Sequence, residues 1–285
     1  MGVAGYRRPA QLNEALAALA EAPRIIVAGG TDFYPSRFGR PLDDDVLDIT
    51  GIPELRSIRE EEGRDDGAAW RIPALTTWTD VIEADLPPYF RGLQLAAREV
   101  GGVQIQNAGT VCGNLCNASP AADGVPNLLA LDAEIELAST AGTRRLALAS
   151  FITGNRRTAR RVDELVTAVL VPKPRHAARS TFLKLGARRY LVISIVMIGA
   201  VIEVDNGAIA SARIAVGACS AVAKRLPQLE QELKGRRLDR SLADVVASRH
   251  LQPLAPIDDV RSTADYRNDA TLTLLRRTLD ELAAA

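Results

Sequence analysis

The stretch that decides the fold is residues 109–123, GTVCGNLCNASPAAD. It combines small residues with hydroxyl and amide side chains, and Asp123 is its only carboxylate. Glycine lets a backbone approach a ligand closely, Ser, Thr and Asn donate hydrogen bonds, and Asp123 can accept from sugar-like hydroxyls. The alternative is a polar loop with turn signals, but so little charge is unusual in a solvated loop. The passage predicts a site for a polyhydroxylated, phosphorylated ligand.

A second glycine pair stands at residues 28–32 (AGGTD), directly after the β-branched run 24–28. Two glycines permit positive φ and let backbone amides approach a phosphate, and Thr31 adds a hydroxyl donor. The spacing matches neither the Walker loop nor the GxGxxG fingerprint. Taken alone, it also fits an ordinary turn at the end of a strand.

Apolar runs and turn signals predict the remaining elements. We expect helices at 12–20, 92–100, 238–248 and 269–282, and a helix start at the hydroxyl-rich turn 76–80. Strands are expected at 24–28, 46–49, 134–137, 166–171, 181–185, 192–204 and 208–217. A hairpin of 55–58 and 70–72 should flank the charged stretch 59–66, and Asn206-Gly207 should turn the last two strands.

The best domain boundary is the proline-bearing, basic stretch 172–180. Strands followed by helices beyond it indicate an α+β unit. The chain is balanced, with 35 Lys plus Arg against 35 Asp plus Glu, and only 4% of its residues are aromatic. This composition argues against nucleic-acid binding. No secretory signal or run of about 18 apolar residues is visible, so we expect a cytoplasmic protein without a membrane span.

The chain has three cysteines, Cys112, Cys116 and Cys219, an odd number that fits a reducing compartment. Zinc or an iron–sulfur cluster needs about four ligands. No histidine or second cysteine pair stands near Cys112 and Cys116, so we expect no metal site there. We expect these two cysteines to be small residues that line a cofactor loop, and Cys219 to lie in the core. His176 and His250 lie outside both glycine passages, which makes covalent histidyl attachment of a cofactor improbable.

The two glycine passages together resemble the two FAD-binding segments of the flavoprotein subunit of molybdenum hydroxylases, the family of xanthine dehydrogenase and bacterial carbon monoxide dehydrogenase. The resemblance continues through LLALDA at 128–133, YRRP at 6–9, DEL at 163–165 with Pro172, and FLKLGARR at 182–189. It runs nearly end to end and in order.

The resemblance implies an α+β fold. A two-subdomain FAD-binding unit of the vanillyl-alcohol-oxidase (PCMH) type would span 1–175, with subdomains of about 1–55 and 56–175. A C-terminal domain of the CO dehydrogenase flavoprotein type would span 179–285. It also implies noncovalent FAD on this chain, with [2Fe-2S] clusters on a small partner subunit and a molybdenum cofactor on a large one.

Residue roles follow from the resemblance alone. The first segment would wrap the FAD pyrophosphate, the second would form another phosphate-binding turn, Asp123 would accept from ribityl or ribose hydroxyls, and Val166 and Lys184 would lie near the flavin ring. The implied cofactor-binding residues are Ile26, Val27, Ala28, Gly29, Gly30, Thr31, Asp32, Phe33, Val100, Thr110, Val111, Cys112, Gly113, Asn114, Asp123, Val166 and Lys184. No catalytic residue is expected.

Three residues depart from the family pattern. Cys112 replaces the first glycine of a GGN pair, and its Cβ would tighten that turn. Gln106 stands where an arginine is common. Val100 stands where some relatives place an aromatic ring, so stacking there is lost.

The implied function is electron relay from the [2Fe-2S] clusters through FAD to NAD, oxygen or another acceptor. One rival is a self-contained FAD-dependent oxidoreductase of the same superfamily, and another is a non-redox nucleotide-binding module. Two features stay open. The basic cluster 156–161 fits a solvated face or a docking patch for a partner or pyridine nucleotide, and Tyr190 fits packing of the C-terminal domain or shielding of a flavin face. The sequence does not name the substrate or the acceptor.

Overall fold

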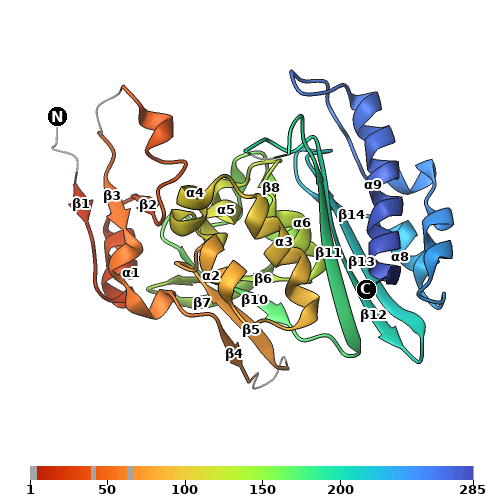
Figure 1. Cartoon of the computed structure of the whole chain (residues 1–285). Helices are drawn as coiled ribbons and strands as arrows, with labels where there is room; N and C mark the ends of the chain where they lie inside the picture. Colours follow the sequence, from red (N-terminus) through yellow and green to blue (C-terminus); the bar gives the residue numbers. More distant parts are fainter. Residues whose placement is uncertain (1–4, 40–42, 63–66, 190, 285) are drawn as a thin grey trace.

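The computed structural model describes residues 5–39, 43–62, 67–189 and 191–284. Three larger sheets follow one another across the molecule (Figure 1): a parallel sheet near the N-terminus, a central antiparallel sheet, and a second antiparallel sheet backed by the C-terminal helices. Strands and helices are largely segregated along the chain, which is the α+β architecture expected from the sequence.

The N-terminal sheet has the strand order β1-β3-β2, and both pairs are parallel. Helix α1 crosses from β1 to β2 and buries Ala15, Ala18 and Leu19 at the spacing of one helix face. The expected helix and two strands of this region are confirmed. The elements are β1 (Tyr6–Arg7), α1 (Leu12–Glu21), β2 (Ile25–Val27), η1 (Pro35–Arg37), β3 (Val46–Asp48), η2 (Ile49–Gly51) and η3 (Pro53–Leu55).

The central sheet has the order β4-β5-β10-β6-β7, and a short hairpin, β8-β9, lies outside it. Its strands are β4 (Arg59–Glu61), β5 (Ala69–Pro73), β6 (Glu134–Ser139), β7 (Gly142–Ala147), β8 (Ile152–Gly154), β9 (Arg157–Thr158) and β10 (Leu165–Pro172). Its helical segments are α2 (Trp78–Glu83), η4 (Pro88–Phe90), α3 (Arg91–Glu99), α4 (Val103–Ala108), α5 (Val111–Asn117), α6 (Gly124–Ala130) and α7 (Leu148–Phe151).

One expectation for this region needs correction. The first arm of the hairpin is β4, within the charged stretch, because Leu55 is buried in η3 instead of in a strand. The passage 101–117, for which the sequence predicted no element, is largely helical, since α4 and α5 meet at Gly109. By contrast, the expected helix start is confirmed: Thr77 and Asp80 form a reciprocal capping box at the start of α2.

The C-terminal sheet is antiparallel, in the order β11-β12-β13-β14. Asn206 and Gly207 both have positive φ, 49° and 78°, which confirms the expected hairpin turn between β12 and β13. The expected helix at 238–248 is wrong: Asp239 caps a short 3-10 segment, η5, instead. The elements are β11 (Ala177–Leu185), β12 (Val196–Asp205), β13 (Ala208–Gly217), β14 (Lys224–Arg225), α8 (Pro227–Leu233), η5 (Arg240–Val245), η6 (Ser248–Leu251) and α9 (Ala264–Ala284).

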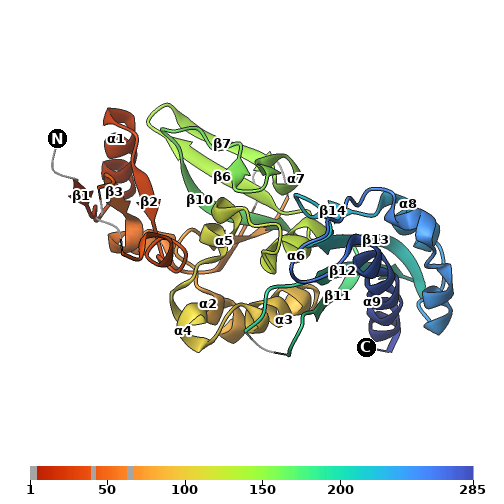
Figure 2. The same cartoon turned by 90° about the horizontal axis from the view of Figure 1, so that it is seen from above.

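Helices cover both faces of the C-terminal sheet (Figure 2): α3 and α6 lie on the side of the central body, and α8 and α9 lie on the other. Helix α6 lies so close that a Cβ added to Gly199 of β12 would be 2.7 Å from the backbone nitrogen of Asn127. Gly92 of α3 packs equally tightly, 2.8 Å from the carbonyl oxygen of Thr181 by the same measure. Glycine therefore permits backbone-to-backbone packing between the two halves of the chain.

Candidate functional site

The first glycine passage leaves strand β2 as a turn with free amides. Gly30 has a φ of 68°, whereas Gly29 is not in the left-handed region. Tyr34 N donates to Gly30 O, but the backbone N–H groups of Gly29 through Phe33 donate to no acceptor within the described residues. Consecutive free N–H groups in a glycine turn form a concave anion-binding surface.

This turn packs directly on the second passage. A Cβ added to Gly29 would lie 1.8 Å from the carbonyl oxygen of Ala108, the last residue of α4. On the other side, a Cβ added to Gly109 would lie 3.4 Å from Thr31 Oγ1. The two segments, about eighty residues apart in sequence, are thus one structural unit.

In the second passage, helix α5 begins at a side-chain cap. Thr110 Oγ1 accepts from Gly113 N at 3.0 Å, Asn114 N donates to Thr110 O, and Val111 N donates to Thr76 O. Those three amides are therefore engaged within the protein. Asn114 differs, since its buried Oδ1 finds no hydrogen-bond donor within the described part of the chain. An orphaned buried acceptor of this kind needs a partner, and a ligand hydroxyl would provide one.

Two implied residues of α5 face away from the turn. Val111 is fully buried in the core, and Cys112 is 3% exposed, with its Sγ 3.9 Å from Ile72 O. Burial raises the pKa of the Cys112 thiol far above its ordinary value, so this sulfur is an inert core group. Cys116 is exposed, Cys219 is buried as expected, and all three cysteines are free.

Asp123 immediately precedes helix α6 and is almost buried. Its Oδ2 accepts from Lys184 Nζ at 2.8 Å, and its Oδ1 accepts from Ser194 Oγ at 2.6 Å. Lys184 also donates to Glu99 O at 3.3 Å. Burial raises the pKa of Asp123, while Lys184 and Ser194 oppose that shift. The C-terminal body thus supplies both partners of this carboxylate.

Asp32 of the glycine turn is tied to α5 and to the β8-β9 hairpin. Asn117 Nδ2 donates to Asp32 Oδ2 at 2.8 Å, and Asn117 Oδ1 accepts from Arg156. Arg156 has a φ of 56° at the hairpin tip and also donates its backbone N–H to Ala118 O. These Asp32–Asn117–Arg156 hydrogen bonds join the two glycine passages through side chains.

The remaining expected residues lie around this unit. Ile26, Val27 and Ala28 form and follow β2, and Phe33 carries the guanidinium of Arg37 at 4.0 Å from its ring centroid. Val100 ends α3 and is half-buried, while Val166 is buried in β10. Tyr190, whose role the sequence leaves open, lies outside the described residues.

Two residues of the unit, Ser194 and Arg156, were not expected from the sequence, whereas Asn117 lies in the second passage but had no particular role there. The basic cluster 156–161 was noted, but nothing local indicated that Arg156 would reach α5. Arg160 instead donates to the carbonyl oxygens of Arg161, Val162 and Glu164, so it stabilises its own loop.

Neither histidine joins the site. His176 Nδ1 lies 4.0 Å from Asp205, and buried His250 lies beside Glu232. Within the described ranges, no group of three or more His, Cys, Asp or Glu side chains could hold a metal ion. Among those residues, no helix is long and apolar enough to cross a membrane.

Turn amides without an acceptor, an orphaned amide oxygen and a buried carboxylate are groups that suit a phosphorylated, hydroxyl-bearing cofactor. Residues 2–174 match the family described as the FAD binding domain in molybdopterin dehydrogenase, and residues 181–282 match the CO dehydrogenase flavoprotein C-terminal domain. The chain belongs to the family of FAD-binding medium subunits of molybdenum hydroxylases, which are components of oxidoreductases.

Individual relatives agree. The chain is 30% identical to the xanthine dehydrogenase FAD-binding subunit of Escherichia coli O157:H7, over 99% of this chain and 97% of that protein. It is 36% identical to the nicotinate dehydrogenase FAD-subunit of Eubacterium barkeri over 70% of this chain and 67% of that one. A chain of CO dehydrogenase from Oligotropha carboxidovorans superposes with a TM-score of 0.87 at 27% identity, covering 99% and 98% of the two chains. The expected resemblance, fold class and FAD cofactor are confirmed.

Proposed function

We propose that this chain relays electrons inside a molybdenum hydroxylase. It would take them from [2Fe-2S] clusters on a small subunit and pass them to NAD or another acceptor, while a large molybdenum-cofactor subunit hydroxylates the organic substrate. The names of the relatives, FAD-binding subunits of larger dehydrogenases, support a role as one component among several. A [2Fe-2S] cluster typically takes four cysteines, and this chain has three.

One observation carries the cofactor assignment: the glycine turn packs at Gly29 on the backbone of Ala108 and Gly109, and its N–H groups from Gly29 through Phe33 have no acceptor within the described residues. We infer that these amides, with the Thr31 hydroxyl, hold the pyrophosphate of FAD. Asn114 Oδ1 and the remaining lone pairs of Asp123 fit hydroxyl donors of the cofactor. Donors for phosphate and acceptors for hydroxyls are therefore both present.

The other implied residues have positions that limit their roles. The side chains of Val111, Cys112 and Val166 are buried, so we propose that they shape the site from the core. The side chain of Lys184 is 6% exposed, and its ammonium group lies directly beside the carboxylate of Asp123. We propose that this cation influences the electronic properties of the bound flavin.

Bound FAD supplies the redox chemistry, because a flavin exchanges either one or two electrons. The chain's own residues bind it, orient it and place one positive and one negative side chain beside it.

We also propose the domain division 1–175, with subdomains of about 1–55 and 56–175, and 179–285. The family matches at 2–174 and 181–282 support that division. A cytoplasmic location is proposed with it, on the free cysteines.

The rival, a self-contained flavin oxidoreductase, would need a catalytic His, Tyr or Ser poised over the flavin. The two histidines lie elsewhere, and the hydroxyl of Ser194 donates to Asp123, which favours the relay. A non-redox nucleotide-binding module is opposed by the family matches.

The cofactor assignment is tested by purifying the chain and recording its visible spectrum. We expect a flavin band, and we expect acid or denaturant to release all of the flavin as free FAD, since both histidines lie away from the proposed site and the thiols of Cys112 and Cys219 are buried. Colourless protein that does not bind added FAD would overturn the assignment.

A further inference from the structure

Helix α6 lies between the two halves of the chain, and the C-terminal body contacts both of its ends. Asp123, just before the helix, accepts from Lys184 and Ser194. At the other end, Arg225 donates to Leu129 O at 3.2 Å and Arg213 donates to Ala130 O at 2.8 Å. Seven helical residues span about 10 Å, so these contacts bracket the whole helix.

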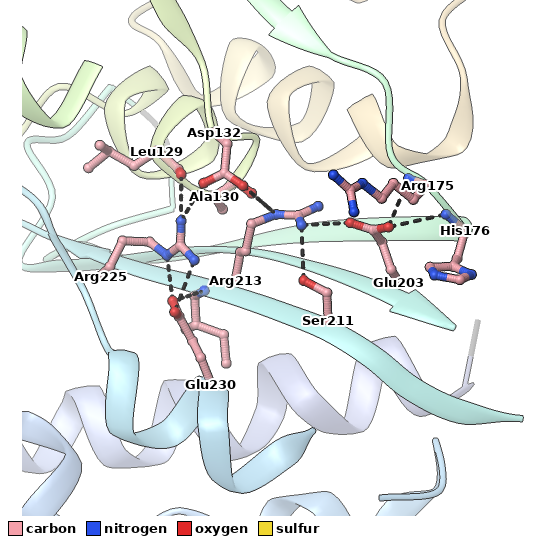
Figure 3. A network of polar contacts seen from close by, with 11 residues as sticks. Leu129, Ala130, Asp132, Arg175, His176, Glu203, Ser211, Arg213, Arg225 and Glu230 are labelled. Atoms are coloured by element: carbon pink, nitrogen blue, oxygen red, sulfur yellow. Dashed lines mark hydrogen bonds and ion pairs between the residues drawn. The ribbon is translucent and has the colours of Figure 1, made fainter. Parts of the chain in front are cut away.

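The far-end contacts form a network of charges (Figure 3). Asp132, which has a φ of 51°, pairs with Arg225 at 2.7 Å and with Arg213 at 3.3 Å. Both arginine side chains extend from the C-terminal sheet toward the end of α6. Cations at the C-terminal end of a helix also interact favourably with its exposed carbonyls and dipole.

Each of the two arginines also pairs with a glutamate of the C-terminal domain. Glu203 of β12 accepts from Arg213, and Glu230 of α8 accepts from Arg225. Glu203 further accepts from the backbone N–H groups of Arg175 and His176, where the chain enters the C-terminal sheet. The arginine side chains therefore have little freedom to leave the end of α6.

Between its ends, α6 packs on glycines. A Cβ at Gly199 would lie 2.7 Å from Asn127 N, and one at Gly217 would lie 2.8 Å from Pro126 Cγ. A helix of one or two turns moves as a rigid body, so fixing one end and the middle fixes the other end. The position of Asp123 is thus set by the C-terminal body, beyond the FAD-binding family match, which ends at residue 174.

We propose that the C-terminal domain completes the FAD site by positioning Asp123, with Ser194 acting at the near end of α6 and Arg213 and Arg225 at the far end. Ser194 is 2% exposed and holds the oxygen of Asp123 that Lys184 does not. This inference rests on the proposed function, because it takes Asp123 to face the cofactor. Ser194, Arg213 and Arg225 are positioning residues that need not touch FAD.

The near end is tested with Ser194→Ala. Loss of one hydrogen bond to a carboxylate should raise the Kd for FAD about three- to tenfold. Ser194→Thr, which keeps the hydroxyl, should recover most of that affinity. Ser220→Ala is the control, since the hydrogen bonds of Ser220 Oγ among the described residues are to Cys219 O and Ala255 N, both inside the C-terminal domain.

The far end is tested with Arg225→Met and the milder Asp132→Asn, which keeps the left-handed backbone favourable. Both should raise the Kd for FAD about two- to fivefold, the scale of a lost, partly exposed ion pair, and alter the shape of the bound flavin's visible band. Arg276→Met is the control, because the hydrogen bond of Arg276 within the described part of the chain is to Val246 O, inside the C-terminal domain. Kd is measured well below the Tm of every variant, so that unfolding does not contribute.

A Kd within error of wild type for both Ser194→Ala and Asp132→Asn would overturn the inference. It would also fail if Arg276→Met weakened FAD binding as much as Arg225→Met at equal loss of Tm, because the effect would then be general destabilisation. Failure of the proposed function looks different: the wild-type chain itself would bind no FAD.

Discussion

Lys184 and Asp123 form a nearly buried ion pair, with Nζ 2.8 Å from Oδ2 and side chains that are 6% and 10% exposed. It joins strand β11 of the C-terminal sheet to the start of α6. Replacing one member of such a pair is costly, because the other charge stays buried without a partner.

The ion pair predicts a non-additive mutant cycle. Lys184→Met should destabilise the protein by about 3–5 kcal/mol, because it strands the charge of Asp123. The double variant Asp123→Asn/Lys184→Met should be more stable than Lys184→Met alone, although it should bind FAD more weakly than wild type. Chemical denaturation of the four proteins checks this, and strictly additive changes would contradict the account.

A second prediction concerns Gly29. A methyl group there would lie 1.8 Å from Ala108 O, so Gly29→Ala must separate the two glycine passages. We expect FAD binding to be lost and Tm to fall. The cause is the clash of the new methyl group with the backbone of Ala108. Equilibrium dialysis with FAD measures the loss, and a variant with unchanged affinity would contradict the packing of these segments.

Comparing Gly30 with Gly39 separates the effect of backbone strain from that of side-chain crowding. Gly30 and Gly39 both have left-handed φ, 68° and 74°, but a Cβ at Gly30 would lie 2.6 Å from the Tyr34 ring and one at Gly39 would contact nothing within 4 Å. Each alanine variant should lose about 1–2 kcal/mol of stability from strain. Only Gly30→Ala should also weaken FAD binding. Equal loss of FAD affinity in Gly39→Ala would show that the glycine turn is not the phosphate site.

The Asp32–Asn117–Arg156 hydrogen bonds give a further test of the proposed FAD site. Asn117→Ala removes the contacts that hold Asp32 against α5, leaving a mobile carboxylate beside the proposed pyrophosphate. We expect the Kd for FAD to rise about three- to thirtyfold, and more at low ionic strength, where charges are less screened. Asp32→Asn in the same background should restore part of the affinity. No recovery would show that the charge of Asp32 does not matter.

Stability should depend on pH through Glu136, which pairs with Arg71 across the central sheet. Burial alone would raise the pKa of Glu136, but hydrogen bonds from Arg71 and Thr167 outweigh it and hold the pKa below its ordinary value. The ionised form therefore stabilises the fold above about pH 4.3, and this contribution is lost as pH falls through the folded pKa.

The variant Glu136→Gln isolates that contribution. It should cost about 1–3 kcal/mol near neutral pH, with a difference from wild type that shrinks below about pH 4.3. Glu60→Gln, which removes an ion pair with the exposed Lys173, is the control and should change little. A pH-independent difference for Glu136→Gln would contradict the assignment.

The sequence predicted the elements whose signals are local. Apolar runs located β10, β12 and β13, Asn206-Gly207 located a hairpin, and Thr77 with Asp80 located the start of α2. It failed where tertiary packing decides. Glu136 alternates with apolar residues, a pattern typical of a solvent-facing position, yet it is buried because Arg71 reaches it from β5, two strands away.

The site residues also divide into those that a local pattern predicts and those that tertiary packing decides. The glycine passages were visible in the sequence, but their contact was not, because it joins backbones about eighty residues apart. Asn117 and Asp32 are separated by 85 positions, and Ser194 and Asp123 by 71. No local pattern predicts hydrogen bonds at that separation, so Ser194 and Arg156 were found only in the fold.

The central claim is electron relay without substrate chemistry, and the most direct measurement compares the purified chain with the reassembled complex. Alone, the chain should carry releasable FAD and exchange electrons with a dye, or with NADH if NAD is the acceptor. It should turn over no purine, aldehyde or N-heterocycle, and turnover should appear only after the iron–sulfur and molybdenum subunits are added. Hydroxylation of an organic substrate by the isolated chain would contradict the relay and favour a self-contained oxidoreductase.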